Sequence, residues 1–164
     1  MNNKKSIFYF LFALFIIMLN SSVFAQKKSI DHTDYAKWET LKNTAISENG
    51  SYVSYEIQPL KGDTYLYIYN VQNQSLDSIY RAKSAKFSKD EKWMVYKIET
   101  GYDTLRKLKL EKVNRKKWPK DSIGIYNLQT GSIQKIADVK SFEFDQDHNV
   151  LTYLVNTNDA LPVV

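Results

Sequence analysis

The sequence predicts an all-β fold made of a repeated antiparallel unit, and two observations lead to this prediction. Residues 45–57, 86–98 and 143–155 align in one register, each with an apolar residue, a Ser or Asp, a polar turn and an alternating strand. The first two segments are 41 residues apart and the last two are 57 apart. A hairpin that recurs with a period of about 40–45 residues is typical of β-propeller blades, which are four-stranded antiparallel sheets.

A second match completes the repeating unit. Residues 67–72 align with residues 124–129, again 57 positions apart, so the 16 extra residues of the second unit lie between positions 98 and 125. Tyr55, Tyr96 and Tyr153 occupy the same position of the aligned strands. Because aromatic residues at regular spacing usually belong to a core, these tyrosines are predicted to pack between sheets.

The strands and turns of the repeat follow the rules of short antiparallel sheets. Residues 53–57 alternate between apolar and polar types, and residues 94–98 and 151–155 repeat the pattern, which predicts one apolar face per strand. Asn49 and Gly50 predict a two-residue primed turn, because both residues tolerate a positive φ.

The repeats also define the predicted organisation of the chain. We expect a signal peptide at 1–25, a lead-in at 26–43, and an incomplete propeller at 44–156 with about two and a half four-stranded blades. The blades are expected at 44–82 and 83–139, with the start of a third at 140–156 and an unstructured, truncated tail at 157–164. Since a propeller needs about four to eight blades, the chain is expected to be the front part of a longer protein or a truncated gene product. The alternative is a complete small sandwich of two or three sheets.

The N-terminus has the three parts of a secretory signal peptide. Lys4 and Lys5 precede an apolar run at 7–19, and residues 23–25 form a small-residue cleavage site, so cleavage is expected after Ala25. The run falls short of the roughly 18–20 apolar residues that span a bilayer. The protein is therefore expected to be exported, to the periplasm or the medium, with no stable membrane anchor after cleavage. Without cysteine, the exported domain relies on its core.

The basic character of the chain is concentrated in the extra residues of the second unit. The whole chain has a formal charge of +5. Residues 106–120 contain eight basic residues and one acid, Glu111, which gives +7, so the rest of the mature chain carries about −4. Nucleic-acid binding is not expected, because Trp118 is the only aromatic residue of this stretch.

The structure expected for this stretch is a solvated loop. Leu108, Leu110 and Val113 would allow part of it to form an extended hairpin, which Pro119 would end before the blade resumes. A contact to another domain or to an acidic surface is the functional alternative.

Motifs that carry out chemistry are absent from the sequence. It has no cysteine, no G-x-S-x-G, no H-E-x-x-H and no phosphate-binding glycine loop. His148 is expected on a surface turn, where Asp145 and Asp147 favour the backbone geometry. The segment 31–34 contains His32 and two aspartates, but one histidine and two carboxylates on a lead-in favour solvation over a metal site. No catalytic, cofactor-binding or metal-binding residue is therefore predicted, and no cofactor.

Several segments resemble a known family. Residues 38–41 (W-E-T-L), 46–55 (I-S-E-N-G-S-Y-V-S-Y) and 59–63 (P-L-K-G-D) look like the opening of a secreted bacterial prolyl oligopeptidase (S9) family serine peptidase. Residues 87–93 are similar to the F-S-x-D-G blade motif of those propellers, with Glu91 where glycine is usual, and residues 103–128 resemble an insert of the same group. The resemblance covers most of 38–155, although TolB-like and WD40-like propellers share the blade motif.

The resemblance implies a function that the chain does not perform alone. In that family an N-terminal propeller covers a C-terminal α/β-hydrolase domain, which carries a Ser-Asp-His triad, and restricts access to small peptides. None of the triad positions exists in this chain, so residues 1–164 alone are not expected to hydrolyse a substrate. The implied role is that of a gate, with the parent protein's hydrolase domain and peptide substrates as partners.

Two other functions stay open from the sequence. A non-enzymatic periplasmic propeller of the TolB-like or WD40-like kind would be a protein-binding scaffold and would close without a hydrolase domain. A self-contained small β protein would be monomeric and would melt cooperatively. The DNA beyond codon 164 separates these alternatives.

Overall fold

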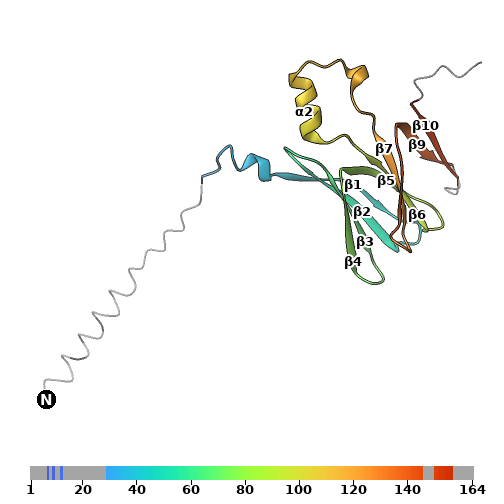
Figure 1. The fold of residues 1–164 in the computed structure, drawn as a ribbon. Coiled ribbons are helices and arrows are strands. Elements are labelled where there is room, and N and C mark those ends of the chain that lie inside the picture. The colour runs from blue at the N-terminus through green and yellow to red at the C-terminus, as the bar shows by residue number, and fades with distance from the viewer. Residues whose placement is uncertain (1–6, 8, 10–11, 13–28, 146–149, 157–164) are drawn as a thin grey trace, which may run out of the picture. The chain divides into compact units, whose positions relative to one another are not determined.

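Three antiparallel sheets make up the computed structural model, which describes residues 7, 9, 12, 29–145 and 150–156 (Figure 1). The chain divides into two units, residues 1–31 and 32–164, and the sheets belong to the second. The first sheet contains β1 (Glu39–Ile46), β2 (Tyr52–Pro59), β3 (Tyr65–Asn70) and β4 (Ser75–Tyr80). The second contains β5 (Ala82–Phe87), β6 (Trp93–Ile98), β7 (Ser122–Asn127) and β8 (Ile133–Ile136), and the third pairs β9 (Val139–Phe144) with β10 (Leu151–Val155).

Each sheet is built from consecutive strands, which lie side by side in chain order. Two four-stranded sheets followed by a two-stranded one match a partial β-propeller, so the predicted fold class of about two and a half blades is confirmed. Strand β1 begins at Glu39, before the expected start of the first blade at residue 44, because residues 39–42 pair with residues 56–59 of β2. Part of the predicted lead-in therefore belongs to the first sheet.

The first and second sheets each have a β-bulge at the same place in their first strand. The register shifts in β1 and in β5 around two residues with positive φ, Asn43 (45°) and Ser84 (54°). The buried carboxylate of Glu56 accepts hydrogen bonds from the Asn43 side-chain amide (2.8 Å) and from the Ser84 backbone N–H (2.5 Å). Since a buried charge without partners is costly, these bonds make Glu56 a link between the two bulges.

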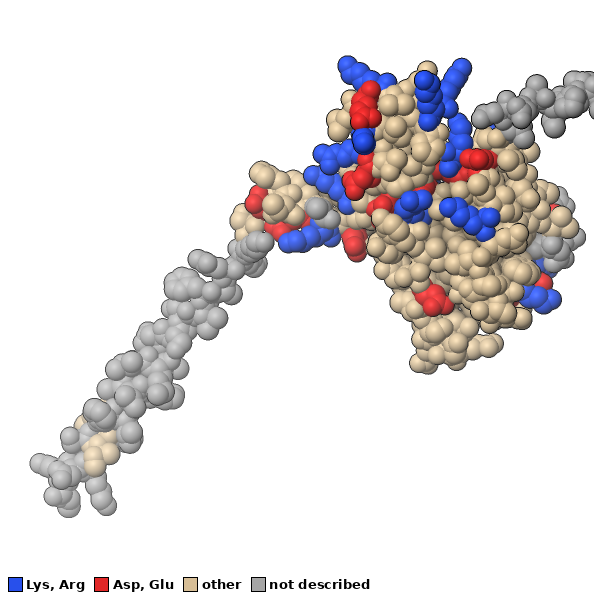
Figure 2. Space-filling view, viewed as in Figure 1, with Lys and Arg blue, Asp and Glu red and all other residues tan. Residues whose placement is uncertain are grey.

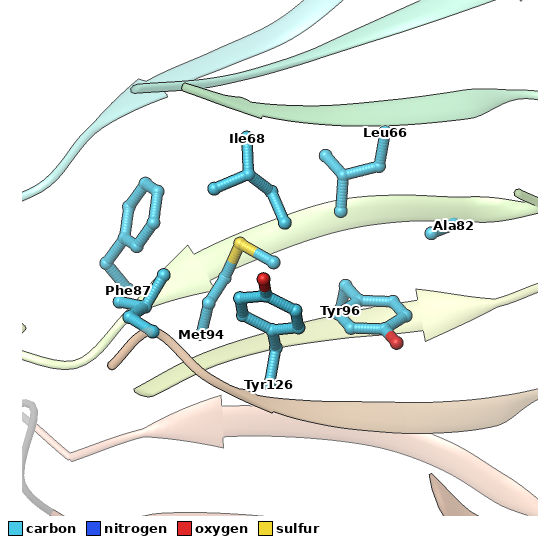
Figure 3. Packing of buried hydrophobic residues seen from close by; sticks show 8 residues of the cluster. Leu66, Ile68, Ala82, Phe87, Met94, Tyr96 and Tyr126 are labelled. Atoms are coloured by element: carbon cyan, nitrogen blue, oxygen red, sulfur yellow. The ribbon is translucent and has the colours of Figure 1, made fainter. Parts of the chain in front are cut away.

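The core lies between the sheets. Leu66 and Ile68 of the first sheet pack toward Met94, Tyr96 and Tyr126 of the second (Figure 3). Burial of a side chain of this size contributes about 1.5–3 kcal/mol. The opposite face of the second sheet packs on the third through a second cluster, which contains Val95, Ile123, Val139 and Phe144.

The three aligned tyrosines differ in burial. Tyr96 is 1% exposed and packs against the first sheet, which confirms its predicted position between sheets, whereas Tyr153 is 43% exposed. Tyr55 is half-buried and stacks on Tyr67 with ring centroids 5.2 Å apart. Successive residues of a strand point to opposite faces, so Tyr55 lies on the face of the first sheet opposite to the buried Glu56. That face is turned away from the second sheet.

The turn of the first hairpin differs from the expected one. Gly50 has φ 75°, but Asn49 is not among the residues with positive φ, so the predicted two-residue primed turn is wrong. The backbone N–H of Ser47 donates to the Tyr52 carbonyl at 3.0 Å, and the Tyr52 N–H donates to the Ser47 hydroxyl at 2.9 Å, which leaves four residues in the loop. The second hairpin repeats this geometry with Glu91 (φ 52°) at the position of Gly50.

The extra residues of the second sheet form a helix, where the sequence predicts a solvated loop, part of which could be an extended hairpin through Leu108, Leu110 and Val113. Helix α2 (Tyr102–Leu110) and the 3-10 helix η2 (Arg115–Lys117) connect β6 to β7, and another 3-10 helix, η1 (Tyr35–Lys37), precedes β1. The α2 segment is rich in Leu, Lys and Arg, which favour helix, and it contains neither Gly nor Pro. An acid in its first turn and lysines in its last turn complement the helix dipole.

The predicted signal peptide and tail fall almost entirely outside the described residues. Of residues 1–25 only positions 7, 9 and 12 are described, and none of 157–164, so both stay predictions. None of the helices in the described part of the chain is long and apolar enough to cross a membrane.

Tyr96 requires a glycine on the neighbouring strand. It pairs directly with Gly124 of β7, and a Cβ added to Gly124 would lie 2.2 Å from the ring Cζ and 2.4 Å from the hydroxyl oxygen. Such distances are far below van der Waals contact, so the ring occupies the space that any other residue would need. The pair therefore sets how deeply Tyr96 enters the core.

We expect Gly124→Ala to lower the free energy of unfolding by about 1–3 kcal/mol, because the Tyr96 ring must leave its position in the core. Urea unfolding of the full chain measures this change. In a Tyr96→Leu background the same substitution should lower the free energy of unfolding much less, because the aromatic ring that the new Cβ would meet is absent. An equal cost in both backgrounds would mean that the clash is not the cause.

Candidate functional site

The described part of the chain contains no group of three His, Cys, Asp or Glu side chains that could hold a metal ion. His32 is exposed, and Asp34 accepts a hydrogen bond from a lysine of η1 at 2.7 Å. The Asp145 carboxylate accepts a backbone hydrogen bond at 3.0 Å from the residue before β10. Asp147 and His148 lie outside the described residues.

The first strands of the three sheets line a hollow of about 300 Å³. Its walls come from residues 45–48, from residues 85–89 and from residues 143–144. Lys86 of β5 forms an ion pair with Glu143 of β9, and these two residues occupy the same position of the repeat. Basic and acidic side chains thus stand together on the wall of this hollow.

Glu91 joins the two hairpin turns that follow these strands. The backbone N–H of Asn49 in the first turn donates to Glu91 Oε1 in the second at 2.6 Å. Burial acts to raise the pKa of Glu91, but hydrogen bonds from Ser47, Ser51 and Asn49 outweigh it and lower the pKa to about 2. A glycine would adopt the positive φ at lower cost, whereas the carboxylate adds charge-assisted bonds between the sheets.

Tyrosine hydroxyls make further links between the first and second sheets. The Tyr126 hydroxyl donates to Asp77 Oδ2 at 3.1 Å, and the Tyr52 hydroxyl donates to the Leu128 carbonyl at 3.1 Å. Burial and the bond to Asp77 raise the pKa of Tyr126 to about 12. These groups line a polar hollow of about 230 Å³ between the turns. At neutral pH the Tyr126 hydroxyl stays protonated, so it acts as a hydrogen-bond donor and not as a base.

Asp63 fastens helix α2 to the first sheet. Its carboxylate, in the loop between β2 and β3, accepts a hydrogen bond from the N–H of Tyr102 at 2.6 Å and another from the Tyr80 hydroxyl. The bond to Asp63 raises the pKa of Tyr80. The N-cap residue Gly101 has no side chain that could cap the helix, so a carboxylate from another sheet takes this role.

The segment after α2 is held by its own contacts. The Val113 N–H donates to the Leu108 carbonyl at 3.0 Å, with Lys112 at φ 53° between them, which is the pattern of a Schellman C-cap. The Trp118 indole N–H donates to the Val113 carbonyl at 3.0 Å, and the Arg115 guanidinium lies 5.7 Å from the indole ring. Residues 99–121, which contain α2 and η2, form the basic insert.

Basic side chains cover the basic insert. Figure 2 shows Lys and Arg gathered where Figure 1 places α2 and the segment after it. Its exposed basic residues are Arg106, Lys107, Lys109, Lys112, Arg115, Lys116, Lys117 and Lys120.

Sequence reasoning located the basic stretch and the unusual Glu91 but missed several of the polar links. Glu56 looked like one of the solvent-facing residues of an alternating strand, and Asp63 like an ordinary loop residue. Their partners are 28 and 39 residues away in sequence. The one local signal was the Gly101-Tyr102 helix start, which lacks a capping side chain of its own.

Comparison with known proteins shows similarity at the level of the fold. No family model matches the chain, and no curated protein matches it either. The acylaminoacyl peptidase of Pyrococcus horikoshii is similar with a TM-score of 0.54 and 18% identity, over 76% of this chain and 18% of that one. The β-propeller domain of the trilobed protease from Pyrococcus furiosus, described as having an open velcro topology, is similar with a TM-score of 0.51 and 20% identity. The similarity covers 72% of this chain and 35% of that one.

An acylaminoacyl peptidase in complex with Z-Gly-Gly-Phe-chloromethyl ketone is also similar, with a TM-score of 0.54 and 20% identity, over 75% of this chain and 18% of that one. At such identities the similarity shows the fold alone. The three-sheet unit thus has the fold of a part of peptidase propellers. The chain spans 18–35% of the length of these solved structures.

We expect the stabilising effect of Glu91 to depend on pH. Because the pKa of Glu91 in the folded protein is lowered from 4.5 to about 2, its charged form contributes stability above pH 4.5 that is lost as the pH falls toward 2. Glu91→Gln should therefore be less stable than the wild type at neutral pH and approach it in acid. Urea unfolding at a series of pH values measures the difference. Glu48→Gln, in the first hairpin turn, is the matched control, and a gap that stays constant down to pH 2 would contradict the expectation.

Asp63→Ala should free the start of helix α2. Loss of a cap costs about 1 kcal/mol, which corresponds to roughly fivefold faster amide exchange in residues 102–110. Hydrogen-exchange mass spectrometry of the full chain measures this rate. Asp103→Ala, in the first turn of the same helix, should have a smaller effect. Equal acceleration in β6 would show that Asp63 stabilises the sheet and not the helix.

Proposed function

We propose that the chain is the N-terminal propeller part of an exported serine peptidase, in which it gates the access of peptides to a C-terminal α/β-hydrolase domain. The observation that carries this proposal is the similarity in fold to peptidases and to a peptidase propeller domain, over 72–76% of the chain. The segments that resemble the prolyl oligopeptidase family add to it. Catalysis belongs to the domain with the triad, and this part contributes selection of substrates.

The hollow at the first strands suits such a role. Propeller blades surround a central channel, and in the proposed complete propeller the walls formed by β1, β5 and β9 would face it. Lys89 and Glu48 flank the Lys86–Glu143 pair on the rim of this hollow. Charged groups of both signs can contact the termini and the backbone of a short peptide, while a closed ring of blades would keep out folded proteins.

The outer face of the first sheet supports a longer propeller. Tyr55, Tyr67, Tyr65 and Tyr80 form a series of ring contacts on this face, with centroids 5.1–6.4 Å apart. The equivalent face of the second sheet, which includes Tyr96, is covered by the first sheet. A broad apolar face usually has a partner, and the repeat indicates a further blade of the parent protein as that partner.

Export is part of the proposal. The predicted signal peptide at 1–25 would direct the protein to the periplasm or the medium. The N-terminal sequence of the exported product should begin at Gln26. A product that keeps Met1 in the cell would contradict this part of the proposal.

The DNA beyond codon 164 tests the proposal most directly. We expect a reading frame with further blades, followed by an α/β-hydrolase domain with a G-x-S-x-G nucleophile elbow. The expressed parent should hydrolyse short peptides faster than a folded protein that contains the same sequence, and residues 1–164 should hydrolyse neither.

Two outcomes would overturn the peptidase function. A frame that closes six or seven blades and then stops would favour the TolB-like or WD40-like scaffold, which a pulldown from envelope extract would then test. A stop codon followed by an unrelated gene would leave the self-contained β protein, whose full chain should melt cooperatively as a monomer.

A further inference from the structure

The charges of the basic insert are largely unpaired. Of its eight exposed Lys and Arg side chains between positions 106 and 120, only Lys107 lies within 4 Å of a carboxylate among the described residues, at 3.9 Å from Glu111. The acids at the two ends of the insert pair with lysines of the second sheet instead, Glu99 with Lys83 and Asp121 with Lys97 (2.7 Å). A formal charge of +7 in 15 residues is repulsive, so it costs stability unless an anionic partner offsets it.

The basic insert presents these charges on a fixed support. Asp63 holds the start of α2, and the Leu108–Val113 and Val113–Trp118 hydrogen bonds hold its end. A preformed surface loses less conformational entropy on binding than a flexible loop does. This favours recognition by shape as well as by charge.

An exposed leucine lies among the basic side chains. Leu110 is 74% exposed and follows Arg106 and Lys107 by four and three residues on α2. Residues at these spacings are neighbours on a helix surface, so an apolar centre is bordered by positive charge. Protein interfaces combine an apolar centre with a polar rim in this way.

We propose that the basic insert is a docking surface for a carboxylate-rich surface of another protein, with Leu110 at the centre of the contact and Arg106 and Lys107 beside it. The proposal concerns a surface away from the hollow, because α2 lies at the end of β6 opposite to the hairpin turn. It holds whether or not the parent protein is a peptidase.

Other anionic partners fit the surface less well. Nucleic-acid binding uses free aromatic rings for stacking, but the Trp118 indole is hydrogen-bonded to Val113 and has Arg115 beside its ring. Membrane binding scales with buried apolar area, and Leu105 and Leu108 are half-buried within the insert, which leaves Leu110 as the exposed leucine of α2.

The test measures binding of the full chain to a fluorescent acidic peptide of Glu-Glu-Leu repeats. Arg106→Glu/Lys117→Glu should weaken binding about tenfold, because each exposed pair contributes about 0.2–1 kcal/mol and reversal adds repulsion. Lys42→Glu/Lys135→Glu, which makes the same change in net charge at exposed strand residues outside both the insert and the hollow, should leave the affinity within about twofold. Leu110→Ala should weaken binding about threefold at unchanged charge.

Each other outcome overturns the proposal. Absence of binding at low salt would show that the insert does not bind an acidic chain. Equal weakening by both charge-reversal pairs would show a response to net charge only. Stronger binding to phosphatidylglycerol vesicles than to the peptide at matched anionic charge, and loss of that binding in Arg106→Glu/Lys117→Glu, would identify a membrane surface instead. Thermal melts of all variants confirm that each remains folded.

Discussion

Packing of the first sheet onto the second is the interaction on which the rest of the described structure depends, because a four-stranded sheet cannot cover its own apolar face. Leu66 and Ile68 meet Met94 and Tyr96 across the interface. The Tyr96 ring fits because Gly124 leaves room for it. The same packing brings the first strands β1 and β5 together, so the hollow at their ends is a consequence of the core.

Polar links then define how the sheets are aligned. Apolar burial is not directional, whereas Glu56 bonds to the bulges of both first strands and Glu91 bonds one hairpin turn to the other. Each hydrogen bond contributes about 0.5–1.5 kcal/mol net, and more when one partner is charged. Their main effect is to favour one arrangement of two similar sheets over arrangements that slide past it.

Two surfaces with different charge result from this arrangement. Strand β6 begins after a hairpin turn next to the hollow and ends before the basic insert, so these surfaces lie at its opposite ends. The hollow carries both signs of charge, with Lys86 paired to Glu143, whereas residues 106–120 of the basic insert hold eight basic residues and one acid.

The repeat, the alternation of the strands, the all-β fold and the place of the basic stretch could be predicted from the order of the residues, because these features depend on residues close together in the chain. The residue order predicts a solvated loop or an extended hairpin where the structure has α2, because the two-residue spacing of Leu108 and Leu110 suits a strand while the three-residue spacing of Leu105 and Leu108 suits a helix. The burial of Tyr96 and the partial exposure of Tyr55 could not be predicted in this way, because burial depends on whether another sheet packs on that face. The packing of the sheets determines it. The tertiary structure alone also gave the Asp63–Tyr102 and Asn49–Glu91 bonds, whose partners are 39 and 42 residues apart and meet only when the two sheets pack.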